Sequence, residues 1–110
     1  MKTIKQLQSE IHQNAKEHGW WESKREFGTL IALCHSELSE ALEEYRKGYP
    51  INESYYSENG SLEGVPSELA DVVIRILDMC EYYDIDLEKV INEKHLYNKK
   101  RTFKHGNKII

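Results

Sequence analysis

One segment of this chain reads Pro66-Ser-Glu-Leu-Ala-Asp-Val-Val-Ile-Arg-Ile-Leu-Asp-Met-Cys80, and it is apolar at most positions. Its charged residues are spaced as i, i+3, i+7 and i+10, which places them on one side of an α-helix. They are Glu68, Asp71, Arg75 and Asp78. A helix that is apolar around the rest of its circumference lies at the centre of a fold or in an oligomer interface. Because partly buried acids persist only when paired or coordinated, the segment predicts a helix that is central or in an oligomer interface and carries a stripe of paired or coordinated acids.

A second acidic pair, Glu37-Leu-Ser-Glu40, lies earlier in the chain in another helical pattern. Acids three residues apart occupy one helical face and repel by roughly 0.2–0.5 kcal/mol. Two such pairs on neighbouring helices need a compensating partner, and a hard divalent cation is the natural one. A solvated surface is the alternative, and it suits Glu43 and Glu44 better because two basic residues follow them.

The chain is expected to form a single all-α domain over residues 1–110, near the commonest domain size. Periodicity and capping signals predict four helices. Their predicted ranges are Thr3 to about His18, Glu26 to Lys47, Pro66 to about Tyr83, and Asp86 to about Lys100. Residues 48–65 form a long polar connection, expected to be a mobile loop or a lid. No alternating strand pattern is visible, and a basic tail covers residues 101–110.

Charge and composition limit the classes of function. The net charge of −4 divides into +5 over residues 99–110 and −9 over the remainder. A mostly acidic domain with a short basic tail argues against long nucleic acid as a partner. No apolar run approaches membrane-spanning length, and no signal-peptide core follows Met1, so we expect no membrane partner and a cytoplasmic location. Cys34 and Cys80 fall on apolar helical lines and are expected to be buried thiols.

Two further groups of residues suggest ligand contacts. Leu87, Val90 and Ile91 are expected to form a buried line on the last helix, and extending that line reaches Lys94, Asn98 and Arg101. Cations and an amide on an inward line suit phosphate binding, although a basic helix end that favours its own dipole is an equal alternative. Aromatic rings at Trp20 and Trp21 are suited to nucleobase stacking, or one of them covers the core.

The pattern of two acid pairs followed by a helix with Lys94 and Asn98 resembles the MazG-like all-α nucleoside triphosphate pyrophosphohydrolase superfamily. The likeness covers about residues 20–98. Its strongest parts are Ser36-Glu-Leu-Ser-Glu-Ala-Leu-Glu-Glu44 and Gly64-Val-Pro-Ser-Glu-Leu-Ala-Asp-Val-Val-Ile-Arg75. The resemblance implies a four-helix bundle completed by homo-oligomerisation, as a dimer or tetramer. It also implies cleavage of a (d)NTP between the α- and β-phosphates to (d)NMP and pyrophosphate, in a house-cleaning role.

The resemblance further implies the roles of individual residues. Mg²⁺, for which Mn²⁺ could substitute, would be held by Glu37, Glu40, Glu68 and Asp71. Lys94 and Arg101 would meet phosphates, Asn98 and Tyr97 would lie near the sugar or base, and Trp20 or Trp21 would stack on the base. Many family members have two adjacent acids at the start of the first motif, whereas this chain has Ser36 before Glu37. The identity of the base that orients the attacking water is therefore open, and Glu40 is the candidate.

Two other functions remain as alternatives. A non-catalytic helical interaction module would use the acids in internal salt bridges with Arg75 and Lys94. A di-metal redox bundle would bind iron or manganese, but the chain lacks the Glu-x-x-His pair that such bundles use. No GxxxxGK[ST] loop is present, which excludes a P-loop NTPase.

Overall fold

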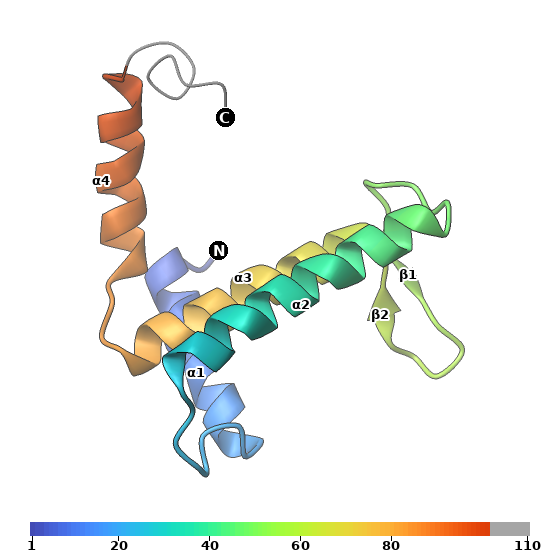
Figure 1. Cartoon of the computed structure of the whole chain (residues 1–110), viewed down its shortest axis with the longest axis horizontal. Helices are drawn as coiled ribbons and strands as arrows, with labels where there is room; N and C mark the ends of the chain where they lie inside the picture. Colours follow the sequence, from blue (N-terminus) through green and yellow to red (C-terminus); the bar gives the residue numbers. More distant parts are fainter. Residues whose placement is uncertain (102–110) are drawn as a thin grey trace.

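A computed structural model of the chain describes residues 1–101, and four helices form most of it (Figure 1). The helices are α1 (Ile4–Glu17), α2 (Phe27–Arg46), α3 (Val65–Tyr82) and α4 (Leu87–Lys99). Two short strands, β1 (Tyr55–Tyr56) and β2 (Leu62–Glu63), lie between α2 and α3. The helical prediction is therefore confirmed, while the predicted basic tail lies outside the described residues apart from Arg101.

Local capping signals explain why the helices begin where they do. Thr3 and Gln6 form a capping box at α1, in which the Gln6 N–H donates to Thr3 Oγ1 and the Thr3 N–H donates to Gln6 Oε1. Asp86 caps α4 by accepting from the Lys89 N–H. These contacts depend only on residues three apart, so the sequence predicts these helix starts to within a residue or two.

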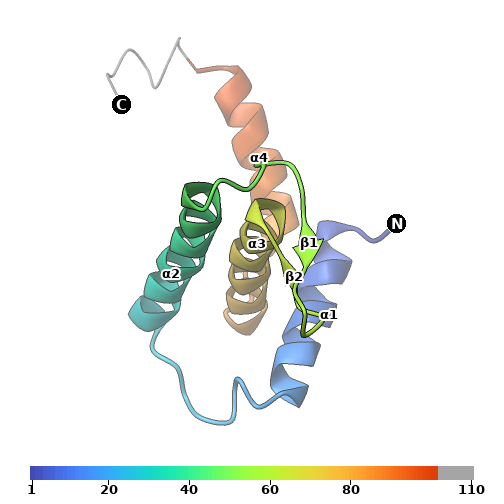
Figure 2. The same ribbon diagram turned by 90° about the vertical axis from the view of Figure 1, so that its right-hand side faces the viewer.

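Helix α3 lies between α1 and α2, as Figure 2 shows. Its carboxyl half supplies Leu77, Met79 and Cys80 to the buried core, and α2, which packs against α3, supplies Leu30 and Ala41. Of the two positions expected for this apolar segment, a central position is observed within the chain. Cys80 is buried and Cys34 half-buried, both thiols are free, and burial raises the pKa of each.

The connection between α2 and α3 contains an antiparallel β-hairpin that the sequence did not predict. Tyr55 pairs with Glu63 and Tyr56 with Leu62. The Ser57 N–H donates to the Ser61 carbonyl across the turn at 2.9 Å. Strands of two residues are too short to show the alternation by which strands are recognised, which is why we expected only loop.

Helix α4 projects away from the α2–α3 pair at the end opposite the hairpin (Figure 1). Its contacts are with α1, where the Lys5 N–H donates to Glu88 Oε1 and the Lys5 ammonium lies 3.7 Å from Asp86. The predicted burial of its apolar line is wrong for the single chain, since Val90 is 47% exposed and Ile91 42%. One described chain therefore does not close a four-helix bundle. Within residues 1–101, none of the helices combines the length and apolar content that a membrane span requires.

Candidate metal centre

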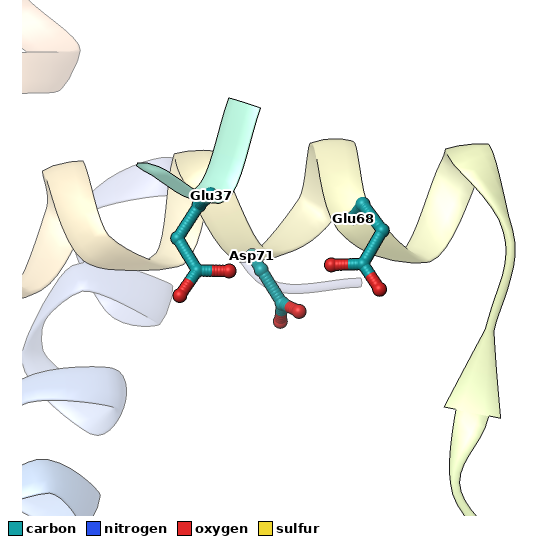
Figure 3. A group of neighbouring side chains, drawn as sticks. All are labelled: Glu37, Glu68 and Asp71. Carbon is teal, nitrogen blue, oxygen red and sulfur yellow. The ribbon is translucent and has the colours of Figure 1, made fainter. Parts of the chain in front are cut away.

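Three carboxylates from two helices converge on one side of α3 (Figure 3). Glu37 comes from α2, and Glu68 and Asp71 come from successive turns of α3. One oxygen from each lies within 4.8 Å of the others. All three side chains are half-buried. The convergence follows from the sequence, because the three-residue spacing aligns Glu68 with Asp71 and the packing of α2 on α3 adds Glu37.

The charges of these acids oppose one another. Burial raises the pKa of Glu68, and the neighbouring charges of Asp71, Glu37, Glu40 and Glu44 raise it further. Burial and the charge of Glu37 raise the pKa of Asp71, against the smaller lowering effects of Arg75 and of a hydrogen bond with Glu68. The protein alone therefore leaves these carboxylates short of positive charge.

Within residues 1–101, Arg75 supplies the cation that pairs with this cluster. Its Nε and Nη2 both lie 2.8 Å from Glu37 Oε1. This contact is half-buried and uses a single carboxylate oxygen, so Glu37 Oε2 stays available to another ligand. One guanidinium against three carboxylates leaves two negative charges, which is the charge that a divalent cation neutralises.

The donor set fits magnesium. Mg²⁺ binds carboxylate oxygens at about 2.0–2.1 Å in octahedral geometry, so its ligand oxygens stand roughly 3.0 to 4.2 Å apart. The observed separations of up to 4.8 Å need only small side-chain adjustments to reach that spacing. The donor atoms are all oxygens, which suits Mg²⁺ or Mn²⁺ better than a softer ion.

Glu40, the fourth predicted ligand, is not part of this group. Its side chain is exposed on the next turn of α2, and the three-acid cluster does not include it. It remains close enough for its charge to raise the pKa of Glu68. The structure thus brings together three of the four predicted ligands and places the fourth at their edge.

Glu44 is the functional-site neighbour that sequence reasoning missed. We expected ordinary surface charge, but Glu44 is only 4% exposed, so that expectation is wrong. Its carboxylate accepts from the Tyr55 hydroxyl, with both oxygens 3.1 Å from Tyr55 Oη. Tyr55, the partner of this buried carboxylate, belongs to the hairpin that the sequence did not predict. The one available signal was spacing, since Glu44 follows Glu37 by two helical turns and so lies on the same face.

A cavity of about 630 Å³ adjoins the acid cluster. Glu37 and Asp71 line it together with Arg75, apolar residues of α1 and Trp20. Its size falls in the range of small-molecule sites, and its mixture of an apolar wall and a few charged groups is typical of them. A ligand in this cavity would therefore contact the acids directly.

The two tryptophans of the α1–α2 connection have different surroundings. Trp20 lines the cavity, is 44% exposed, and lies beneath the guanidinium groups of Arg75 and Arg25, at 5.0 and 5.2 Å from the ring centroid. Trp21 instead donates from Nε1 to Asp78 at 3.0 Å and stacks on Tyr82. Trp21 is thus half-buried and held by protein partners, and Trp20 is the ring that a ligand in the cavity would meet.

Asp78 is fully engaged by protein donors. His12 Nδ1 lies 2.7 Å from Asp78 Oδ1, and Trp21 Nε1 contacts both oxygens. These partners come from α1 and from the connection that follows it. Asp78 therefore ties the amino-terminal part of the chain to α3.

The residues predicted on the last helix lie elsewhere. Lys94, Tyr97, Asn98 and Arg101 are exposed, and none of them lines the cavity beside the acids. The Lys94 ammonium and the Arg101 guanidinium lie 5.0 and 5.9 Å from the Tyr97 ring centroid. The expectation that an inward line of α4 carries them toward the site is wrong within one chain, because α4 packs on α1.

Comparisons of this chain with protein-family models, with curated proteins and with solved structures found no match. The family resemblance therefore stays a prediction from the motifs quoted above. Support for a function comes instead from the chemistry of the acid cluster and its cavity.

Proposed function

We propose that the protein is a Mg²⁺-dependent nucleotide pyrophosphohydrolase that cleaves a (d)NTP between its α- and β-phosphates. The observation that supports this most is the convergence of Glu37, Glu68 and Asp71 within 4.8 Å beside a cavity of about 630 Å³. A cluster with two uncompensated negative charges next to a ligand-sized cavity suits a substrate whose phosphates arrive with a divalent cation.

Each residue near the cluster has a proposed part in the reaction. When bound, Mg²⁺ would neutralise charge that develops on the phosphates and lower the pKa of water. Glu37, Glu68 and Asp71 would hold the ion. Glu40, exposed at the edge, would orient the attacking water. Trp20 would stack on the base. Arg75, which also lines the cavity, would contact the phosphates.

We also propose that the protein functions as a homo-oligomer, a dimer or a tetramer. Helix α2 carries exposed apolar residues from its first turn to its last, on a side separate from that of the clustered Glu37. Its members are Phe27, Ile31, Leu38, Leu42 and Tyr45. An apolar surface that runs the length of a helix marks an interaction site, and a second copy of the chain would cover it. Lys94 and Asn98 would approach phosphates only if α4 packs against such a copy.

The oligomer is tested by light scattering coupled to size exclusion. Leu38→Glu and Leu42→Glu together should convert the protein to a smaller species, because charges in an apolar interface are costly. Glu43→Gln, on the exposed side of α2, is the matched control and should leave the mass unchanged. A monomeric wild type would contradict the proposal.

The activity is tested with a panel of (d)NTPs and Mg²⁺, read by product analysis. We expect a monophosphate and pyrophosphate, and we expect loss of turnover when chelator is added. Glu37→Gln should abolish turnover because it removes a ligand charge, whereas Glu43→Gln should not, since Glu43 pairs with Arg46 at the surface. Release of orthophosphate with a diphosphate product would contradict cleavage between the α- and β-phosphates.

The Arg75–Glu37 ion pair favours a second candidate, a non-catalytic helical interaction module. In that case internal pairing would account for the acids, and thermal melts with and without Mg²⁺ would coincide. The pairing reaches only one of the three clustered acids, and among residues 1–101 no ion pair joins Lys94 to any of them. This candidate therefore accounts for less of the geometry than the metal centre does.

A further inference from the structure

The β-hairpin joins the two helices that carry the acid cluster. It follows α2, which carries Glu37, and it leads directly into α3, whose first turn carries Glu68. Figure 1 shows it against the ends of both helices, at the end of the molecule opposite α4. Any contact that fixes the hairpin to both helices therefore also fixes their spacing at the acids.

The contact with α2 is the hydrogen bond from Tyr55 to Glu44. The Glu44 carboxylate is almost completely buried, and no Lys, Arg or His among the described residues pairs with it. A buried carboxylate is costly unless it is hydrogen-bonded, so this bond to the Tyr55 hydroxyl is strongly favoured. The Tyr55 ring is also stacked on Tyr49, at a centroid distance of 4.6 Å, which limits its movement.

The contact with α3 is a close backbone approach at Gly64. This residue has φ of +111°, and a Cβ there would lie 2.7 Å from the Glu53 carbonyl oxygen. Only glycine tolerates both the dihedral angle and the approach. Gly64 thus joins the second strand of the hairpin directly to the start of α3, with no flexible linker between them. It lies four residues before Glu68.

We propose that Tyr55 is a positioning residue of the acid cluster, which acts through its bond to Glu44 to hold α2 and α3 at the spacing that lets Glu37 and Glu68 share one divalent cation. The inference rests on the metal centre proposed above. Tyr55 does not itself contact the cation. Glu44 serves as the buried acceptor in α2 that receives the hairpin.

The test is calorimetric titration of Mg²⁺ into chelator-treated wild type and Tyr55→Phe. Mutations of groups that orient metal ligands cost about 10- to 100-fold in affinity, so we expect Kd to rise about tenfold in Tyr55→Phe. Tyr56→Phe is the matched control, because Tyr56 is the next residue of the same strand and is 74% exposed. Its Kd should equal that of the wild type.

Two further variants separate positioning from a general loss of stability and from direct ligation of the cation. Leu77→Val perturbs the buried core of α3 away from the acids, so a loss of affinity caused only by lower stability would appear there too. Glu44→Gln keeps an oxygen that accepts from the Tyr55 hydroxyl but removes a negative charge close to Glu68, so its Kd should rise less than that of Tyr55→Phe. A drop as large as that of Tyr55→Phe would make Glu44 a direct ligand and overturn the positioning role.

The outcomes distinguish this inference from the proposed function. If the wild type binds Mg²⁺ and Tyr55→Phe binds it equally well, the positioning role is overturned and the metal centre stands. If the wild type shows no binding, both are overturned. Should Tyr55→Phe fail to fold by circular dichroism, Gly64→Ala tests the contact with α3 and should weaken Mg²⁺ binding in the same way, while unchanged affinity there would contradict the proposal.

Discussion

Asp78 and Asp71 lie on the same polar stripe of α3, two turns apart, yet their surroundings are opposite. Asp78 receives the His12 ring at 2.7 Å and the Trp21 indole at 3.0 Å, so its charge is met by protein donors. Asp71 instead faces Glu37 and Glu68, and among the described residues the nearby Arg75 pairs with Glu37 rather than with Asp71. The fold therefore supplies partners for the carboxylate of Asp78, whereas it places Asp71 among other carboxylates.

This difference separates structural acids from candidate ligands better than spacing does. A buried carboxylate with good donors stabilises the packing around it, as Asp78 does between α1 and α3. A carboxylate grouped with others and short of donors raises the energy of the apo protein until a cation arrives. Such an arrangement persists where binding compensates for it, which is why we assign a functional role to Asp71 and a structural one to Asp78.

The largest effect is expected from Asp71→Asn. The substitution removes a ligand charge from the centre of the cluster, so nucleotide turnover should fall at least about a hundredfold, which is about 2.7 kcal/mol of transition-state stabilisation. The measurement is pyrophosphate release at saturating Mg²⁺, with circular dichroism to confirm folding. Turnover within a few-fold of wild type would remove Asp71 from the proposed site.

Asp78→Ala should act on stability instead. It leaves the His12 ring and the Trp21 N–H without their acceptor, which should cost about 2–3 kcal/mol and lower the Tm by about 10 °C or more. The loss should be the same with and without Mg²⁺, as measured by thermal unfolding in both conditions. A loss confined to the Mg²⁺ condition would show that Asp78 belongs to the metal centre.

The contrast between the two tryptophans predicts a smaller effect on substrate binding. Trp20→Ala should raise KM about tenfold, since stacking of a base on an aromatic ring contributes about 1–3 kcal/mol. Stability should change little, because the Trp20 ring is 44% exposed. Trp21→Phe should do the reverse, lowering the Tm through loss of the bond to Asp78. Equal KM values for wild type and Trp20→Ala would exclude the stacking role.

The smallest predicted effect is on the stability of the metal-free protein. Here the substitution is expected to stabilise the fold, whereas the preceding ones impair activity or stability. Burial and neighbouring acids raise the pKa of Glu68 above its ordinary value of 4.5, so the folded state holds that proton more tightly than the unfolded chain does. The associated stability is present below the unfolded pKa and is lost as pH rises through the folded pKa. In chelator at pH 7.5, Glu68→Gln should therefore be more stable than wild type by roughly 0.5 kcal/mol.

That advantage should shrink as pH falls toward about 4.5, because Glu68 then becomes neutral in the wild type as well. Denaturant unfolding of both proteins across this range measures the difference. Added Mg²⁺ should reverse the order at pH 7.5, stabilising only the wild type. A wild type more stable than Glu68→Gln in chelator would mean that Glu68 is compensated by the protein itself.

The sequence predicted what local rules control. The caps at Thr3 and Asp86, the glycine after α2 and the apolar pattern of α3 set four helices nearly at their observed bounds. Spacing likewise brought Glu68 next to Asp71. These features depend on residues a few positions apart, so a single sequence is enough to predict them.

The missed features depend on contacts between distant residues. The partners of Asp78 are 66 and 57 residues away, and no local signal separates it from Asp71. Glu44 is buried because Tyr55 covers it, and the hairpin that brings Tyr55 there has strands too short to recognise. The contacts of Lys5 with Asp86 and Glu88, where α4 meets α1, likewise join distant residues, and no periodicity encodes them.

We propose that the cluster of Glu37, Glu68 and Asp71 binds a divalent cation, because the neighbouring protein groups leave its negative charge uncompensated. Calorimetric titration of Mg²⁺ into chelator-treated wild type at pH 7.5, beside Asp71→Asn, tests it directly. We predict saturable binding by the wild type and its loss in Asp71→Asn. Absence of binding by the folded wild type, or equal binding by Asp71→Asn, would contradict a metal site at these acids.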